Sequence, residues 1–231
     1  AAEIQDYRDA TNKLIETQYN QKRAMLEQNS EKEIQAIELG QRQWRDSAII
    51  KFEGFIERYP GDGTYTPDAM FRLSELYFER SYETYFQARQ TYEKNVETWK
   101  PGSKTPEPSE PEFHYEPSIA MMQRLIVEFP PYRLLDGAYY LLGYCLGEQG
   151  EDERAVQVYE EMVERTPASR FGPEVWTRIG EYYFNANELP RAMHAYTQVL
   201  GHLDSPFYDK ALYKLAWTHY RLADPERAPD E

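Results

Sequence analysis

The side chains that could carry out chemistry are few in this sequence, and their spacing does not suit it. Zinc-binding helices place ligands at i+3 or i+4 from one another, and no histidine has a partner in that pattern. The histidines are His114, His194, His202 and His219. The only cysteine, Cys145, falls on the apolar face of an expected helix and fits a small buried hydrophobe. There is no glycine-rich phosphate loop. We therefore expect no catalytic residue, no metal and no cofactor, and a protein that is not an enzyme.

The composition narrows the classes of partner. The chain has 231 residues, with 26 basic and 40 acidic side chains, and a net charge of −14. Nucleic acids and anionic membranes attract clustered Lys and Arg, so both are disfavoured as partners. No apolar run approaches the roughly 20 residues of a membrane-spanning helix. Because the chain opens at Ala1, we expect a processed or recombinant fragment.

Two segments, 136–169 and 173–206, carry the same residue types at the same offsets. Their large residues recur at i, i+3, i+4 and i+7, which predicts two antiparallel helices joined by a short polar turn. The pairs Gly143 with Ala155 and Gly180 with Ala192 are expected where the two helices approach most closely. The matched positions are Tyr139, Leu142, Gly143, Leu146, Ala155, Tyr159 and Met162, then Trp176, Ile179, Gly180, Tyr183, Ala192, Tyr196 and Val199.

This spacing resembles the tetratricopeptide repeat family, whose pattern reads W-x2-L-G-x2-Y, then A-x3-F and P. The resemblance implies an all-α helical-repeat solenoid with an extended concave face. Pro167, Ser169 and Phe171, with a long Gln- and Glu-rich N-terminal helix, are also similar to bacterial envelope members of the family. Those members are of the Tol-Pal-associated and outer-membrane-assembly types. The likeness implies a periplasmic or envelope location, with the cytoplasm as the alternative.

Proline and composition divide the rest of the chain. Residues 1–44 are rich in helix formers and predict a long helix whose C-terminal part enters the first repeat, with 45–64 as the second helix. Residues 65–131 predict a repeat opened by an insertion at 80–117, where a helical extension precedes a proline-rich loop. Complete repeats are expected at 132–171 and 172–207. A truncated repeat is expected at 208–231, with Ala228 at the small position of its second helix.

In proteins of this family the first helix of each repeat lines the concave face at fixed offsets. Those offsets give an aromatic surface with acidic residues between the rings, which suits an apolar, proline-rich or basic partner segment. The Lys/Asn/Arg clamp of chaperone-binding members is missing, which argues against an acidic C-terminal tail as the ligand. Alternatively, single rings pack between repeats. The predicted surface comprises Phe71, Glu75, Phe78, Tyr140, Tyr144, Thr177, Glu181, Phe184, Tyr213, Trp217, Tyr220 and Arg221.

The sequence-based hypothesis is a non-catalytic scaffold that captures a protein or peptide segment within a larger, envelope-type assembly. Two alternatives stay open. One is an architectural or oligomerisation segment that acts through the N-terminal helix and the insertion. The other is a module that binds glycan, such as peptidoglycan. Because a lone exposed helix of this composition is marginal, we also expect possible self-association through residues 1–40, in the manner of a coiled coil.

Overall fold

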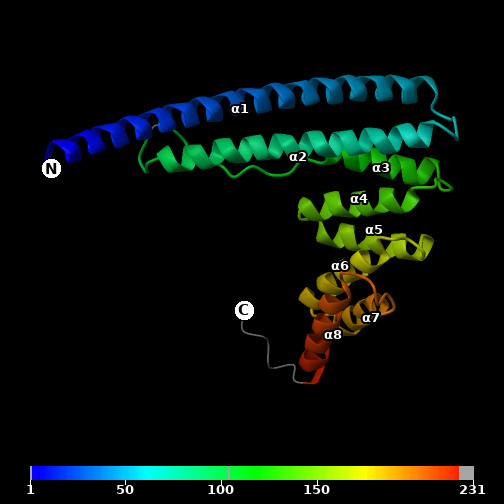
Figure 1. The fold of residues 1–231 in the computed structure, drawn as a ribbon. Helices are drawn as coiled ribbons and strands as arrows, with labels where there is room; N and C mark the ends of the chain where they lie inside the picture. The colour runs from blue at the N-terminus through cyan, green and yellow to red at the C-terminus, as the bar shows by residue number, and fades with distance from the viewer. Residues whose placement is uncertain (1, 104, 224–231) are drawn as a thin grey trace. The chain divides into compact units, whose positions relative to one another are not determined.

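The computed structural model describes the backbone of residues 2–103 and 105–223, with side chains from residue 12 onward. This part of the chain contains eight α-helices and no strand, which confirms the all-α fold class (Figure 1). It forms two compact units, one up to Lys51 and one from Phe52 onward. The helices are α1 (Ala2–Arg58), α2 (Thr66–Thr98), α3 (Glu116–Glu128), α4 (Leu135–Glu148), α5 (Asp152–Arg165), α6 (Gly172–Asn185), α7 (Leu189–Val199) and α8 (Tyr208–Ala223).

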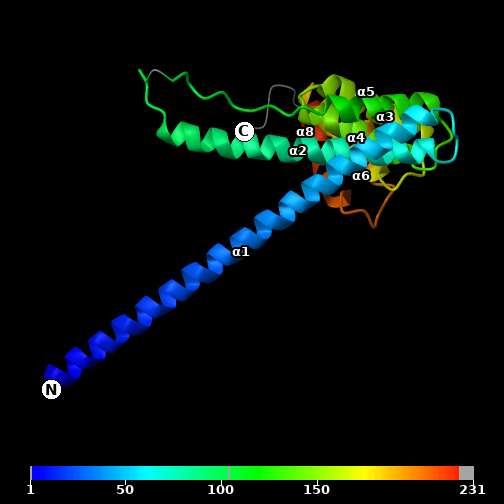
Figure 2. The same cartoon turned by 90° about the horizontal axis from the view of Figure 1, so that it is seen from above.

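The first helix differs from the sequence-based expectation. We expected the chain to turn near residue 44, but α1 runs without interruption from Ala2 to Arg58 (Figure 2). Residues 41–58 contain no proline, and their one glycine, Gly54, is exposed, so nothing stops the helix there. It ends before Pro60 and Gly61, where the Asp62 carboxylate accepts the backbone N–H groups of Thr64 and Tyr65. The predicted pair of helices within 1–64 is therefore one helix.

From α2 onward, each helix packs on the next one along the chain, so that the pairs α2/α3, α4/α5 and α6/α7 stack in succession toward α8 (Figure 1). Their alternation produces a helical-repeat solenoid, in which each repeat buries its apolar face against its neighbours. Ala228 and the rest of the expected truncated repeat after Ala223 lie outside the described residues.

The α4/α5 and α6/α7 hairpins repeat the same close contact, 180 − 143 = 37 residues apart. A Cβ atom on Gly180 would lie 2.5 Å from Cε1 of Tyr196, and one on Gly143 would meet the ring of Tyr159 in the same way. The small residues expected opposite these glycines were Ala155 and Ala192. The structure instead puts an aromatic ring there, four residues further along the second helix. The glycines are required because the ring occupies the space of a side chain.

The two hairpin turns also have the same backbone form. Gly150 and Asn187 adopt the left-handed conformation, with φ of 76° and 61°. The following N–H groups, of Glu151 and Glu188, reach back to the carbonyls of Leu146 and Tyr183 and satisfy the end of the first helix. Asparagine is one of the few non-glycine residues that tolerate this conformation, so both turns stay short despite their different sequences.

The lone cysteine lies in this core. Cys145 on α4 is fully buried, and burial raises the pKa of its thiol to about 12. At neutral pH it is therefore an uncharged thiol rather than a reactive thiolate.

A buried hydrogen bond joins α2 and α3. Ser118 of α3 donates its hydroxyl hydrogen to the carbonyl of Ser74 on α2 at 2.9 Å.

Candidate partner-binding surface

The twelve residues of the predicted surface lie on α2, α4, α6 and α8, the first helices of successive pairs. Three of them are buried and offer nothing to a partner. Phe71 packs against α4, where a Cβ on Gly137 would lie 3.2 Å from its ring. Thr177 donates its hydroxyl hydrogen to the carbonyl of Pro173 within α6. Phe184 is covered from α8 by the cations of Lys214 and Arg221, at 5.4 and 4.6 Å from the ring centroid.

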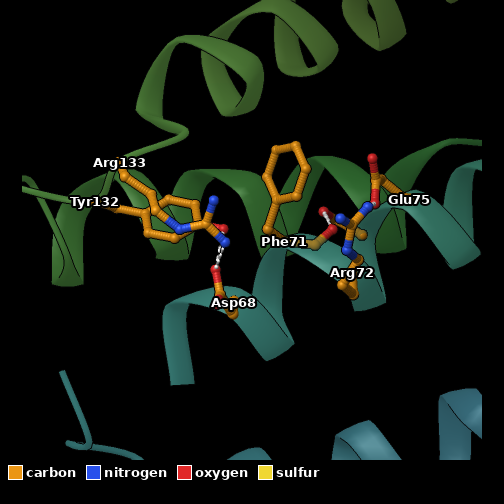
Figure 3. Close-up of polar contacts among 7 residues, drawn as sticks. Asp68, Phe71, Arg72, Glu75, Tyr132 and Arg133 are labelled. Carbon is orange, nitrogen blue, oxygen red and sulfur yellow. Dashed lines mark hydrogen bonds and ion pairs between the residues drawn. The ribbon is translucent and has the colours of Figure 1, made fainter. Parts of the chain in front are cut away.

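Phe71 and Glu75 belong to a network at the start of α2 (Figure 3). The phenol of Tyr132 donates a hydrogen bond to the Asp68 carboxylate at 2.7 Å, and Arg133 donates to the same oxygen at 2.9 Å. The Phe71 and Tyr132 ring centroids are 6.0 Å apart. Arg72, beside them, pairs with Glu75 at 2.6 Å. Asp68 ties the α3–α4 connection to α2, and Phe71 packs on Tyr132 of that connection. Glu75 is paired within α2.

We expect Asp68→Asn to weaken this junction by about 1 kcal/mol, because the charged acceptor for two donors is lost at a partly exposed site. Asp209→Asn is the control, since it also removes a carboxylate from the first turn of a helix. The free energy of unfolding from urea titration measures both. Equal stability losses in the two variants would show that the Asp68 contacts contribute nothing beyond the helix-end charge.

Phe78 is covered by the chain's own insertion, whose described residues 99–103 and 105–115 we call the return segment. This segment runs back beside α2 in an extended form (Figures 1 and 2). Phe113 stacks on Tyr85 with 3.7 Å between ring centroids, and Tyr115 stacks on Phe78 at 5.1 Å. The amide of Gln149 donates to the carbonyl of Phe113 at 3.3 Å. The α2 part of the predicted surface therefore already holds an extended, aromatic peptide segment.

Tyr140 and Tyr144 on α4 are half-buried by their neighbours. Tyr140 stacks on Phe171 with centroids 4.5 Å apart, and its phenol donates to Glu174 at 2.9 Å. The Arg178 guanidinium lies 5.5 Å from the ring centroid of Tyr144. Tyr144 nevertheless keeps one side toward an open cleft, so it alone of this pair can reach a ligand.

That cleft, which we call the α4–α6 cleft, has a volume of about 430 Å³ and opens between α4, α5 and α6. It contains Tyr144 and Glu181 from the predicted surface and adds Arg178, Tyr182 and Tyr159, which the family offsets did not indicate. Its lining residues are Gly143, Tyr144, Gly147, Glu148, Asp152, Ala155, Val156, Tyr159, Arg178, Glu181, Tyr182, Asn185 and Ala186.

The polar groups of the α4–α6 cleft are arranged around a buried tyrosine. The Tyr159 hydroxyl has no hydrogen-bond partner among the described residues, and Tyr159 is 4% exposed. Burial raises its pKa, so the hydroxyl stays protonated and can both donate and accept. Glu174 holds Arg178 at 2.9 Å, and Lys210 holds Glu181 at 2.8 Å. With Glu148 and Asp152 among its lining residues, the cleft offers an acidic edge.

The α8 part of the surface is more open. Tyr213 and Tyr220 are 61% and 43% exposed, and both make edge contacts with the ring of Trp217. Arg221 is turned back, donating to the carbonyl of Phe184 at 3.2 Å and to the side chain of Asn187 at 2.8 Å. Arg221 therefore links α8 to the preceding repeat, while the three rings of α8 remain available.

The described fold is that of an all-α helical-repeat solenoid. Residues 137–169, which form the α4/α5 hairpin, match the family model described as tetratricopeptide repeat. Repeats of this family generally mediate protein–protein interaction and are typically non-catalytic, in line with the extended surfaces that stacked helix pairs create. No curated protein matches the chain.

The described residues also bear on metal binding and on membrane crossing. No group of three or more His, Cys, Asp or Glu side chains among them is placed to hold a metal ion. None of the helices traced between residues 2 and 223 has both the length and the apolar character needed to cross a membrane.

Proposed function

We propose that the protein is a non-catalytic scaffold that binds an extended segment of a partner protein along α4, α6 and α8, with a basic side chain of that segment in the α4–α6 cleft. The observation that carries this proposal is the return segment. Phe113 stacks on Tyr85 and Tyr115 stacks on Phe78, so α2, the first helix of this row, carries an extended aromatic segment of the chain itself.

Of the other first helices, α4 keeps Tyr144 open toward the cleft, and α8 keeps the exposed rings of Tyr213 and Tyr220. Helix α6 contributes Glu181 and Tyr182 to the cleft.

The cleft supports a basic side chain at one position of the partner segment. Glu148 and Asp152 stand on its rim, and its two other charged residues, Arg178 and Glu181, are already neutralised by Glu174 and Lys210. A lysine or arginine would therefore meet uncompensated negative charge, and its N–H groups can donate to the carboxylates of Glu148 and Asp152. An acidic side chain would be repelled at the same place.

We expect a displayed library of random peptides, selected on the protein, to enrich sequences with proline or aromatic residues around a lysine or arginine. Fluorescence polarisation then compares the enriched peptides on two charge-reversal variants. Glu148→Lys should weaken binding by tenfold or more, which is about 1.4 kcal/mol. Glu164→Lys, on an exposed position of α5 outside the cleft, is the matched control and should bind as the unmodified protein does. Enrichment of acidic peptides, or equal weakening by both variants, would contradict the proposal.

We also propose where the protein is located and in what kind of assembly it acts. The likeness of Pro167, Ser169 and Phe171 to envelope repeat proteins favours a cell-envelope assembly and a periplasmic location. A glycan ligand is less favoured, because most rings that could stack on a sugar face are packed against neighbouring residues. The return segment and the N-terminal helix are the places where an additional architectural role would act.

A further inference from the structure

One set of apolar side chains of α1 recurs at a fixed interval that is not a heptad, while Tyr19, Ile34 and Leu39 lie outside this set. A pair of apolar residues followed by glutamate occurs at 14–16, at 25–27 and at 36–38, so that 25 − 14 = 11 and 36 − 25 = 11. The large members of these pairs are all exposed, by 59% to 66%. They are Leu14, Ile15, Met25, Leu26 and Ile37.

An interval of 11 residues corresponds to three helical turns at about 3.67 residues per turn, so the pairs lie in line on one face of a nearly straight helix. We call this face the α1 stripe. The glutamates of the three motifs fall on another side, where Glu27 pairs with Arg23 at 2.7 Å and Glu38 with Arg42 at 3.9 Å. Figure 2 shows α1 as one helix along its whole length, so the stripe is continuous.

We expect the α1 stripe to pack against a partner helix with the same period. Every residue from 12 to 39 is exposed in the described chain, whereas helices draw most of their stability from packing an apolar face. A helix with a heptad would drift out of line with an 11-residue stripe after a few turns. The chain that is certain to carry the matching period is a second copy of this one.

The charges within the stripe decide the direction of that second copy. Lys22 and Glu33 lie between the apolar pairs, at the centre of the stripe. In a parallel, in-register pair, Lys22 would face Lys22 and Glu33 would face Glu33, which costs free energy for both contacts.

An antiparallel pair avoids this cost and keeps apolar residues together. When facing residue numbers sum to 51, Leu14 faces Ile37 and Met25 faces Leu26, because 14 + 37 = 25 + 26 = 51. Lys22 then faces Asn29, and Glu33 faces Gln18, so no like charges meet. Only this register places each of the three apolar pairs opposite an apolar pair of the other copy.

We propose that α1 is a homodimerisation element, in which two copies of the chain pair antiparallel along the α1 stripe, with the twofold axis between Met25 and Leu26. An 11-residue period gives such a pair a slight right-handed supercoil rather than the left-handed one of heptads. The dimer joins two repeat arrays, so that two partner-binding surfaces belong to one particle.

The decisive experiment is disulfide trapping on the full chain. In the antiparallel register, a mixture of the Leu14→Cys and Ile37→Cys proteins should form a mixed disulfide under mild oxidation. Leu14→Cys alone should not, because its two cysteines would be 37 − 14 = 23 residues apart, roughly 35 Å along the helix. The unmodified protein is the control, since its one cysteine, Cys145, is buried. Trapping of Leu14→Cys with itself but not with Ile37→Cys would show a parallel pair and overturn the proposal.

Sedimentation equilibrium tests the stripe without any cross-link. Leu26→Glu should raise the dimer dissociation constant by tenfold or more, because each dimer receives the charge twice near its axis. Ala24→Glu adds the same charge on the opposite side of the helix and should leave the dissociation constant unchanged. Equal effects of the two variants, or a monomeric unmodified protein at every concentration, would refute the proposal. Circular dichroism checks that both variants keep their helix content.

Discussion

Replacing Tyr115 with alanine should lower the free energy of unfolding by about 3–5 kcal/mol, the usual cost of deleting a large buried aromatic ring. Tyr115 is fully buried and stands immediately before α3. Its ring lies between Phe78 of α2, at 5.1 Å, and Phe113 of the return segment, at 5.2 Å. The change therefore removes one of the ring contacts that hold the return segment on α2, while the stacking of Phe113 on Tyr85 remains. Urea denaturation gives the stability, and limited proteolysis across residues 100–112 gives the release of the segment.

The control for this prediction keeps the ring and removes only the hydroxyl. The Tyr115 hydroxyl is buried, and none of the described residues accepts its hydrogen or donates one to it. Tyr115→Phe should therefore be neutral or slightly stabilising, because an unsatisfied polar group leaves the interior. If both variants lose the same stability, or if Tyr115→Ala leaves cleavage of residues 100–112 unchanged, the stacking does not hold the segment.

The repeats could be predicted from the sequence because their signals are local. Gly143 and Gly180, the offsets to Tyr159 and Tyr196, and the polar turns between them lie within one pair of helices and need no knowledge of the neighbours. The helical period of residues 80–99 is local too, and α2 extends to Thr98. The turn predicted near residue 44 was wrong, because it rested on the assumption that residues 1–64 contain the two helices of a repeat. The absence of any breaker between Gln41 and Ser47 was the better guide.

The surface could be predicted only in part, because periodicity tells which helix face a ring is on but not what covers it. Phe71 and Phe184 have the offsets of surface residues, yet each is buried by the repeat that follows. Phe78 is covered by Tyr115, at the end of an insertion that the 34-residue repeat pattern does not include. The α4–α6 cleft is lined in part by Tyr159 of α5, a second helix, which first-helix offsets do not sample.

A second large effect is expected at the glycines that face those rings. Gly143→Ala should destabilise the protein by about 1–3 kcal/mol, the typical cost of overpacking a well-filled core. The new methyl group would occupy the space of the Tyr159 ring, with Cζ 2.7 Å away, so the ring or the helix must move. Because α4 and α5 are the pair that bounds the α4–α6 cleft, the same change should also weaken binding of any peptide selected on the protein. Thermal and urea unfolding measure the first effect, and fluorescence polarisation measures the second.

Gly147 offers the matched control, since it lies one turn further along the same helix. A Cβ there would meet only the Cβ of Ala155, at 4.0 Å, which is an ordinary contact. Gly147→Ala should therefore stabilise the protein by roughly 0.5–1 kcal/mol, the difference in helix propensity between the two residues. Stability changes of opposite sign in the two variants would show that the loss at Gly143 is steric and that α4 tolerates replacement of a glycine elsewhere. The double variant Gly143→Ala with Tyr159→Leu removes the ring that the methyl would strike. Its loss of stability should therefore be smaller than the sum of the losses in the two single variants. Strict additivity in that pair would mean that Tyr159 is not what makes Gly143 necessary.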